Sequence, residues 1–179
     1  CRVLEKIGEK YGHTFTFTPY LMGGCAIDKY GDPLPEAELQ KCIESDSVLL
    51  GAVGGPKWNN VPGDKRPEKG LLRLRAGMGV YSNNRPAKIW PQLAEASPLK
   101  PSIVEKGIDF IIVRELIGGI YFGKHETTEE NGCKVAFDGL SYNEKEIERI
   151  GRIGFETAQK RNKKLCRVEK SNVLDSSRL

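Results

Sequence analysis

Residues 113–123 constrain the fold of this chain more than any other stretch of its sequence. They continue an apolar run, residues 108–113, which predicts a buried strand that delivers Arg114 and Glu115 at its end. The pair Gly118–Gly119 then permits a backbone turn that residues with a Cβ resist, and Tyr121 follows at once. The segment therefore brings a fixed positive charge and a phenol together at the edge of a sheet.

Two interpretations of this segment are open. An arginine beside a tyrosine suits the binding of a small carboxylate and the transfer of a proton to it. A buried ion pair and a tyrosine in the core would leave the same pattern without any chemistry.

The composition narrows the class of protein. A formal net charge of +4 is mild, whereas nucleic-acid binding usually needs a concentrated basic stripe. Five widely spaced cysteines without a CxxC pair, and only two histidines, favour a reducing compartment over a disulfide framework or a zinc site. No apolar run is long enough to span a membrane. We therefore expect a cytoplasmic protein that binds neither nucleic acid nor membrane.

The hydrophobic pattern predicts an α/β fold, because helical stretches alternate with short apolar strands. Asn143 and Glu146 have the spacing of a capping box, and an apolar stripe at helical period follows them. Residues 47–53 read as a buried strand of the kind found in parallel sheets. We expect helices over residues 1–12, 35–45, 70–75 and from 143 onward, and strands over residues 14–19, 47–53, 80–86, 108–113, 134–142 and 164–169.

A loop over residues 54–68 contains three prolines and three glycines and lacks apolar periodicity. It directly follows the carboxyl end of a predicted strand, which is where open α/β sheets bind ligands. Because it is not a GxGxxG fingerprint, it does not indicate a Rossmann nucleotide site.

Charged side chains near the ends of other elements are candidates for a binding site. Arg75, Arg85 and Arg114 come from three separate segments, and three converging guanidinium groups would suit a dicarboxylate. Lys170 follows the last predicted strand and, like Tyr121, needs a lowered pKa to transfer protons near neutral pH. Each of these residues is also compatible with an ordinary surface position.

Five motifs together resemble the isocitrate/isopropylmalate dehydrogenase family, and they follow in order along the whole chain. The motifs are residues 54–58 (GGPKW), 66–75 (RPEKGLLRLR), 84–88 (NRPAK), 113–123 (VRELIGGIYFG) and 168–174 (VEKSNVL). The resemblance covers about half of such an enzyme and lacks the first strand and the C-terminal half. Three positions depart from the usual pattern, namely Ile117, Asn84 and Glu169.

The resemblance implies NAD-dependent oxidative decarboxylation of 3-isopropylmalate to 4-methyl-2-oxopentanoate in leucine biosynthesis. It assigns Tyr121 as the acid that protonates the enolate after carbon dioxide leaves. It assigns Lys170 as the base for the substrate hydroxyl, acting in the partner subunit's site of a homodimer. The substrate-binding residues that it implies are Arg75, Arg85, Arg114, Asn172, Leu71 and Leu72, the two leucines contacting the isopropyl group.

The resemblance also implies the cofactors. Mg²⁺ or Mn²⁺ would be bound by aspartates outside this sequence, so no metal ligand is expected within it. NAD would contact the loop residues Gly55, Pro56, Lys57, Trp58, Asn59, Asn60, Val61, Pro62, Gly63, Asp64, Lys65, Arg66, Pro67 and Glu68. We expect residues 1–85 to form part of a cofactor-side domain, and residues 86–179 to form a substrate and dimerisation domain with a hairpin around 121–142.

Other activities remain open. Sister enzymes of the family act on homoisocitrate, isocitrate or tartrate, and a non-catalytic anion-binding module could keep the same scaffold. The sequence begins at Cys1 inside a helical pattern without an N-cap, as an internal piece of a longer protein does. We therefore expect these residues alone to be inactive and marginally stable.

Overall fold

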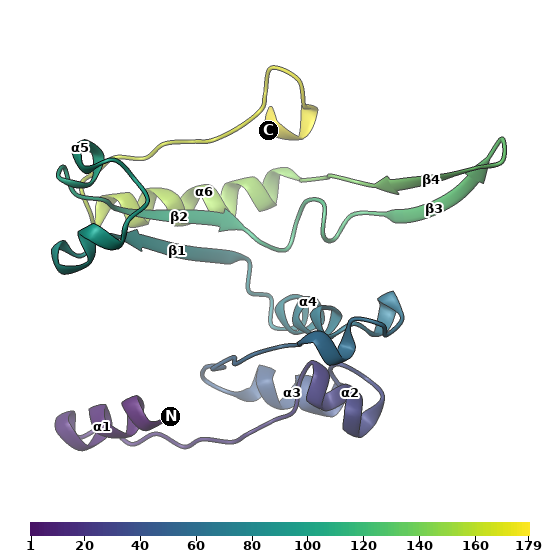
Figure 1. The fold of residues 1–179 in the computed structure, drawn as a ribbon, viewed down its shortest axis with the longest axis horizontal. Coiled ribbons are helices and arrows are strands. Elements are labelled where there is room, and N and C mark those ends of the chain that lie inside the picture. The colour runs from purple at the N-terminus through teal and green to yellow at the C-terminus, as the bar shows by residue number, and fades with distance from the viewer. The chain divides into compact units, whose positions relative to one another are not determined.

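The computed structural model describes residues 1–179 and divides into two compact units, Cys1–Met78 and Gly79–Leu179. Figure 1 shows the course of the chain through each unit. The division precedes the expected boundary at residues 85 and 86, which falls inside a strand. The functional assignment of the two units stays a prediction.

The first unit is helical and packs around a small core. Leu34, which is 1% exposed, anchors a cluster with Leu39, Cys42 and Leu74, and burying such a leucine contributes roughly 1.5–3 kcal/mol. Its α-helices are α1 (Arg2–Tyr11), α2 (Gly24–Tyr30), α3 (Glu36–Glu44) and α4 (Pro67–Gly77), and its short 3₁₀ helices are η1 (Pro56–Trp58) and η2 (Gly63–Lys65).

Two strands expected in this unit are wrong. Neither residues 14–19 nor residues 47–53 pair with a neighbouring strand, and pairing is what defines a strand. Within the second segment Val48 lies against the core, but Leu49 is 73% exposed, so the segment is not buried as a whole. The carbonyl of Val53 instead accepts a hydrogen bond from Gly24 N at 2.8 Å, at the start of α2.

The second unit contains two antiparallel two-stranded sheets, joined by irregular chain. β1 (Ser82–Lys88) pairs with β2 (Asp109–Glu115), and β3 (His125–Glu130) pairs with β4 (Cys133–Asp138). The second pair forms a hairpin that lies within residues 121–142. The remaining elements of the unit are η3 (Pro91–Ala96), α5 (Pro101–Val104), α6 (Glu144–Gln159) and η4 (Asp175–Ser177).

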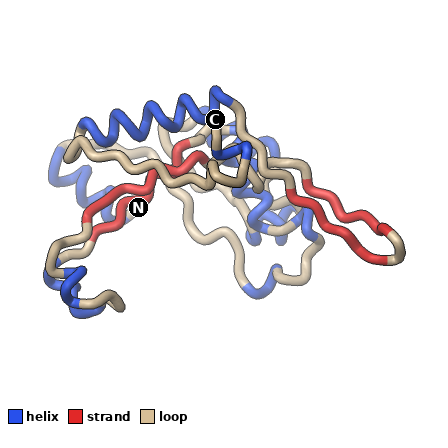
Figure 2. The backbone as a smooth tube through the Cα atoms, turned by 90° about the horizontal axis from the view of Figure 1, so that it is seen from above, coloured by secondary structure: helices blue, strands red, loops and turns tan.

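Helix α6 covers one face of β2, and Figures 1 and 2 both show the helix running alongside this strand. Ile111 and Val113 are half-buried, whereas the alternating Ile112 is 50% exposed. Because successive side chains of a strand point to opposite faces, β2 has a face toward α6 and an open face. The candidate site lies on the open face.

The strand expected over residues 164–169 is also wrong. The segment has no pairing partner, and Val168 is 93% exposed. The Arg167 guanidinium donates hydrogen bonds to the Glu169 carboxylate at 2.9 Å and to the Ser177 carbonyl at 2.7 Å. These local contacts fold the segment back on itself without a sheet. Parallel pairing, expected from the buried run at 47–53, does not occur within the chain.

The N-terminus of α6 forms the predicted capping box. Glu146 N donates to Asn143 Oδ1 at 3.1 Å, and Asn143 N donates to Glu146 Oε2 at 2.9 Å. Two N–H groups without a partner inside the helix are thereby satisfied.

Replacing Asn143 by alanine is expected to lower the free energy of unfolding by about 1 kcal/mol, because Glu146 N loses its side-chain acceptor and keeps only the carbonyl of residue 143. Urea denaturation of the 179-residue chain, followed by far-ultraviolet circular dichroism, measures this change. Asn162→Ala, in the turn after α6, is the control and should stay within about 0.5 kcal/mol of the unsubstituted chain. Equal losses in both variants would contradict a role for the cap.

No helix of the chain combines the length and hydropathy needed to cross a bilayer.

Candidate active site

Arg85 and Arg114 lie on the same open face of the β1–β2 sheet. Asn83 is directly opposite Arg114 in the antiparallel register, and Arg85 is opposite Ile112. Residues opposite one another, and residues two apart in a strand, share a face. Arg85 Nε also donates a hydrogen bond to Asn83 Oδ1 at 2.6 Å, which holds the guanidinium beside the Arg114 position.

Arg114 and Tyr121, singled out from the sequence, meet in the structure. The Arg114 guanidinium carbon lies over the Tyr121 ring, 5.5 Å from its centroid, a cation–π arrangement. Tyr121 is 56% exposed and Arg114 is exposed as well, so Tyr121 is not a core residue and Arg114 is not part of a buried ion pair. The two groups are therefore accessible to a small anion.

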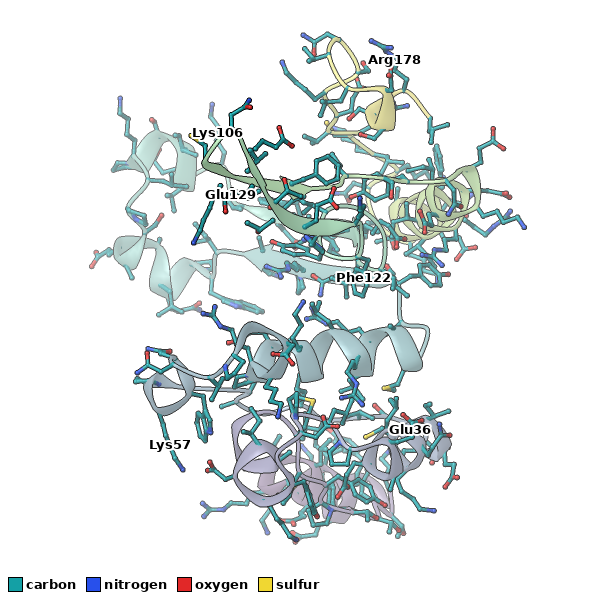
Figure 3. All side chains as sticks on the ribbon, turned by 90° about the vertical axis from the view of Figure 1, so that its right-hand side faces the viewer. Glu36, Lys57, Lys106, Phe122, Glu129 and Arg178 are labelled. Carbon is teal, nitrogen blue, oxygen red and sulfur yellow. The ribbon has the colours of Figure 1, made fainter.

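The turn between them forms where the glycine pair predicted it. Gly119 has φ +79°, which a side chain would strain, and its N–H donates to the Ser141 carbonyl at 2.9 Å. A Cβ on Gly118 would lie 2.8 Å from Tyr142 Cδ1. Figure 3 labels Phe122, which follows Tyr121 in this segment.

A hollow of about 240 Å³ lies beside this turn. The residues lining it are Ile117, Gly118, Gly119, Phe122, Ser141, Tyr142, Asn143 and Glu146. Neither Arg114 nor Tyr121 lines it, so it is separate from the arginine face.

Glu115 forms a buried ion pair, as one interpretation of the segment expected, but with a partner that the sequence did not identify. Its side chain is 6% exposed and is paired with Arg149 of α6, where Arg149 Nη2 lies 2.8 Å from Glu115 Oε1. The hydrogen bond to this carboxylate raises the pKa of Arg149. The sequence does carry a signal for this burial. Arg114 and Glu115 are consecutive on a strand, and consecutive side chains point to opposite faces, so with Arg114 on the open face Glu115 points toward the covered one.

Arg75, Leu71 and Leu72 belong to α4 in the other unit. Leu71 and Leu72 precede Arg75 by four and three positions, so all three lie on one side of the helix. All three side chains are half-buried. An apolar surface beside a guanidinium is therefore present on α4, and the substrate-binding roles of these residues stay a prediction.

Lys170 and Asn172 lie on an exposed turn of the second unit. Val173 N and Leu174 N both donate to the Lys170 carbonyl, at 3.1 and 3.0 Å. The ammonium group of Lys170 makes no hydrogen bond or ion pair within the chain. The structure therefore does not bring Lys170 to Tyr121, and its catalytic role stays a prediction.

The predicted cofactor loop is more ordered than a structureless connection. Trp58 Nε1 donates to Asp28 Oδ1 at 3.2 Å, and Lys57, labelled in Figure 3, lies 2.6 Å from the other oxygen of that carboxylate. The hydrogen bond from Lys57 lowers the pKa of Asp28. Glu68 lies in the first turn of α4, where an acidic residue complements the positive end of the helix dipole. Asp28 is a second residue that sequence reasoning missed.

No group of three or more His, Cys, Asp or Glu side chains in the chain is arranged to hold a metal ion. Mg²⁺ and Mn²⁺ prefer oxygen ligands, and this chain brings no cluster of three carboxylates together for them.

Comparison with known proteins identifies the fold. A 3-isopropylmalate dehydrogenase of Clostridium acetobutylicum is 55% identical over 178 residues, which cover 99% of this chain and 50% of that protein. The corresponding enzyme of Aquifex aeolicus is 58% identical and is covered to 49%. The chain thus spans about half the length of the curated relatives that it matches.

A solved structure and a family model agree with these relatives. The crystal structure of a β-decarboxylating dehydrogenase from Thermococcus kodakarensis superposes with a TM-score of 0.63 at 26% identity, covering 97% of this chain and 46% of that one. The family model described as isocitrate/isopropylmalate dehydrogenase matches residues 1–179. The α/β fold class is confirmed, and the chain belongs to the isocitrate/isopropylmalate dehydrogenase family.

Proposed function

We propose that this chain forms about half of a 3-isopropylmalate dehydrogenase, an enzyme that oxidises 3-isopropylmalate with NAD and releases carbon dioxide to give 4-methyl-2-oxopentanoate. The observation that carries the proposal is the contact between Arg114 and Tyr121 on an open sheet face that also bears Arg85. The relatives named for this activity, at 51–58% identity, support it.

The two arginines of the sheet face bind the carboxylates of the substrate. Each guanidinium presents a planar fork of N–H donors that matches a carboxylate and stays charged at physiological pH. Arg85 and Arg114 are diagonal neighbours across β1 and β2, so they can hold one small dianion between them. Arg75 of α4 is the third carboxylate ligand of the proposal.

Tyr121 completes the chemistry by donating a proton. Oxidation at C2 of the substrate makes the neighbouring carboxylate at C3 a leaving group, and loss of carbon dioxide leaves an enolate. The Tyr121 hydroxyl protonates C3 of this enolate, and its proton is then replaced from solvent. The cation–π contact with Arg114 fixes the ring during this step. The loop of residues 55–68 would hold NAD, which would supply the acceptor for the hydride of C2. Lys170 takes the proton of the C2 hydroxyl.

Leu71 and Leu72 set the substrate class. A leucine surface packs on an isopropyl group, whereas it leaves the third carboxylate of isocitrate without a hydrogen-bond partner. The proposal also includes a homodimer, in which Lys170 serves the partner's site, and a divalent cation, Mg²⁺ or Mn²⁺, whose ligands this chain does not supply. Its five free cysteines suit a cytoplasmic location.

A chimera tests the proposal. Residues 1–179 replace the matching half of the Clostridium acetobutylicum relative, and NADH formation is measured with Mg²⁺ and each candidate acid. We expect kcat/KM for 3-isopropylmalate to exceed that for isocitrate by at least about 100-fold, because a buried unpaired carboxylate is strongly disfavoured. The unmodified relative is the control for the donor half. A chimera that is folded but prefers isocitrate, homoisocitrate or tartrate would overturn the choice of substrate.

A further inference from the structure

The carboxylate of Glu115 joins the end of β2 to two other parts of the second unit. Oε1 accepts from Arg149 Nη2 at 2.8 Å, and Oε2 accepts from Arg149 Nε at 3.3 Å, a two-pronged contact with α6. Oε1 also accepts from the backbone N–H groups of Ile117 and Gly118, at 3.0 and 3.3 Å. The Glu115 carboxylate, which is 6% exposed, thus forms an ion pair with α6 and also accepts hydrogen bonds from a backbone turn.

Arg149 is itself held from a second side. Its guanidinium carbon lies 4.5 Å from the centroid of the Tyr81 ring, and the Tyr81 carbonyl accepts a hydrogen bond from Leu116 N at 2.8 Å. The ion pair therefore lies among Tyr81, which directly precedes β1, the end of β2 and α6. Such a surrounding restricts the conformations open to the carboxylate.

The turn that Glu115 holds leads directly to Tyr121. Gly123 N donates to the Gly119 carbonyl at 3.1 Å, so the residues between these two glycines form one tight turn. Arg114 and Glu115 are neighbours on β2, and their side chains point to opposite faces. A single short segment therefore connects the buried ion pair on the α6 face with the Arg114–Tyr121 contact on the open face.

We propose that Glu115 is a positioning residue for Tyr121: bound to Arg149, it holds the turn at residues 117–119 so that the tyrosine ring stays beside Arg114. This role rests on the proposed function, since it concerns the acid of that reaction. Glu115 does not touch the substrate in this account, and it acts only through the geometry of Tyr121. A displacement of about 1 Å at a reacting group can cost roughly 100-fold in rate.

The competing explanation is that the ion pair only stabilises the fold. Removing one partner of a buried pair destabilises a protein whatever lies nearby. The two explanations differ in how the loss depends on Tyr121. If Glu115 positions Tyr121, replacing Glu115 should lower kcat only while the tyrosine hydroxyl is present. If Glu115 only stabilises the fold, replacing it should change kcat by the same factor with Tyr121 and with phenylalanine at that position.

A double-mutant cycle in the chimera distinguishes them. The variants are Glu115→Ala, Tyr121→Phe and the double variant, each measured for kcat, KM and Tm. We expect Glu115→Ala to lower kcat by about 10- to 100-fold with KM for 3-isopropylmalate changed by less than about threefold. In the Tyr121→Phe background the same change should lower kcat by less than about threefold, while the fall in Tm is equal in both backgrounds.

The matched control is a second ion pair at the other end of the same strand. Asp109 of β2 is paired with Arg161, which follows α6. Asp109→Ala should lower Tm and should change kcat by the same small factor with or without the Tyr121 hydroxyl. Glu115→Gln keeps an amide oxygen for the Ile117 and Gly118 N–H groups, so it should retain more kcat than Glu115→Ala even if the alanine variant is poorly folded.

Equal losses of kcat from Glu115→Ala in both backgrounds, or an unchanged kcat, would overturn the positioning role while leaving the proposed function intact. An unsubstituted chimera that folds, binds NAD and turns over none of the four candidate acids would instead overturn the proposed function, and the role of Glu115 with it.

Discussion

Tyr121→Phe in the chimera is expected to lower kcat for 3-isopropylmalate by about 10²- to 10⁴-fold, the usual contribution of a positioned general acid. The phenylalanine ring keeps the cation–π contact with Arg114, so substrate binding should change little and KM should stay within about threefold. Steady-state NADH formation measures both constants.

Phe122→Tyr is the matched control for this substitution, because it adds a hydroxyl to the neighbouring ring and leaves Tyr121 in place. Its kcat should remain close to that of the chimera, since Phe122 lines the hollow beside the turn and not the arginine face. A kcat for Tyr121→Phe within about threefold of the unsubstituted value would remove the tyrosine from the proposed mechanism.

Replacing Arg114 has the second large effect. Arg114→Gln should lower kcat/KM for 3-isopropylmalate by about 10- to 100-fold, because hydrogen bonds to charged groups contribute roughly 1.5–3 kcal/mol. Arg114→Lys keeps the charge but loses the planar fork, so most of the loss should persist. The Tyr121 ring also loses its cation in the glutamine variant, so kcat should fall along with the rise in KM.

Arg152→Gln serves as the control for the arginine series. Arg152 is an exposed residue of α6 whose only ion pair is with Glu148, one turn earlier on the helix. Such surface pairs contribute little, and this variant should keep its kcat/KM. If Arg114→Lys were as active as the unsubstituted chimera, bidentate carboxylate binding at this position would be wrong.

Local patterns of the sequence predicted local structure well. The capping box at Asn143 and Glu146, and the turn at Gly118–Gly119, depend on residues a few positions apart, and the structure contains both. The contact between Arg114 and Tyr121 followed from the same short segment. These features are encoded where they form, and no distant part of the chain is needed to specify them.

Features that depend on distant partners were not predictable in this way. Residues 47–53 have the composition of a buried strand, but a strand also needs a hydrogen-bonded neighbour, which no periodicity reveals. The ion pair between Glu115 and Arg149 joins residues 34 positions apart, and the anchoring of Trp58 by Asp28 joins residues 30 apart. The sequence alone does not identify the partner of either carboxylate.

The active site shows the same division. The sequence placed Arg85 and Arg114 near the ends of strands, and only the β1–β2 register shows that the two share a face. Lys170 also came from a motif, but it lies on an exposed turn, and no hydrogen bond or ion pair joins it to Tyr121. Its proposed place in a partner's site depends on an assembly rather than on one chain.

The most direct test of the central claim follows the proton that Tyr121 delivers. The chimera is incubated with 4-methyl-2-oxopentanoate, NADH and Mg²⁺ in D₂O, and deuterium incorporation at C3 is followed by nuclear magnetic resonance. The enzyme should catalyse this exchange above the rate without protein, and Tyr121→Phe should slow it by about 10²- to 10⁴-fold, in parallel with kcat. Exchange at the unsubstituted rate in the Tyr121→Phe variant would contradict the account, because another group would then be protonating the enolate.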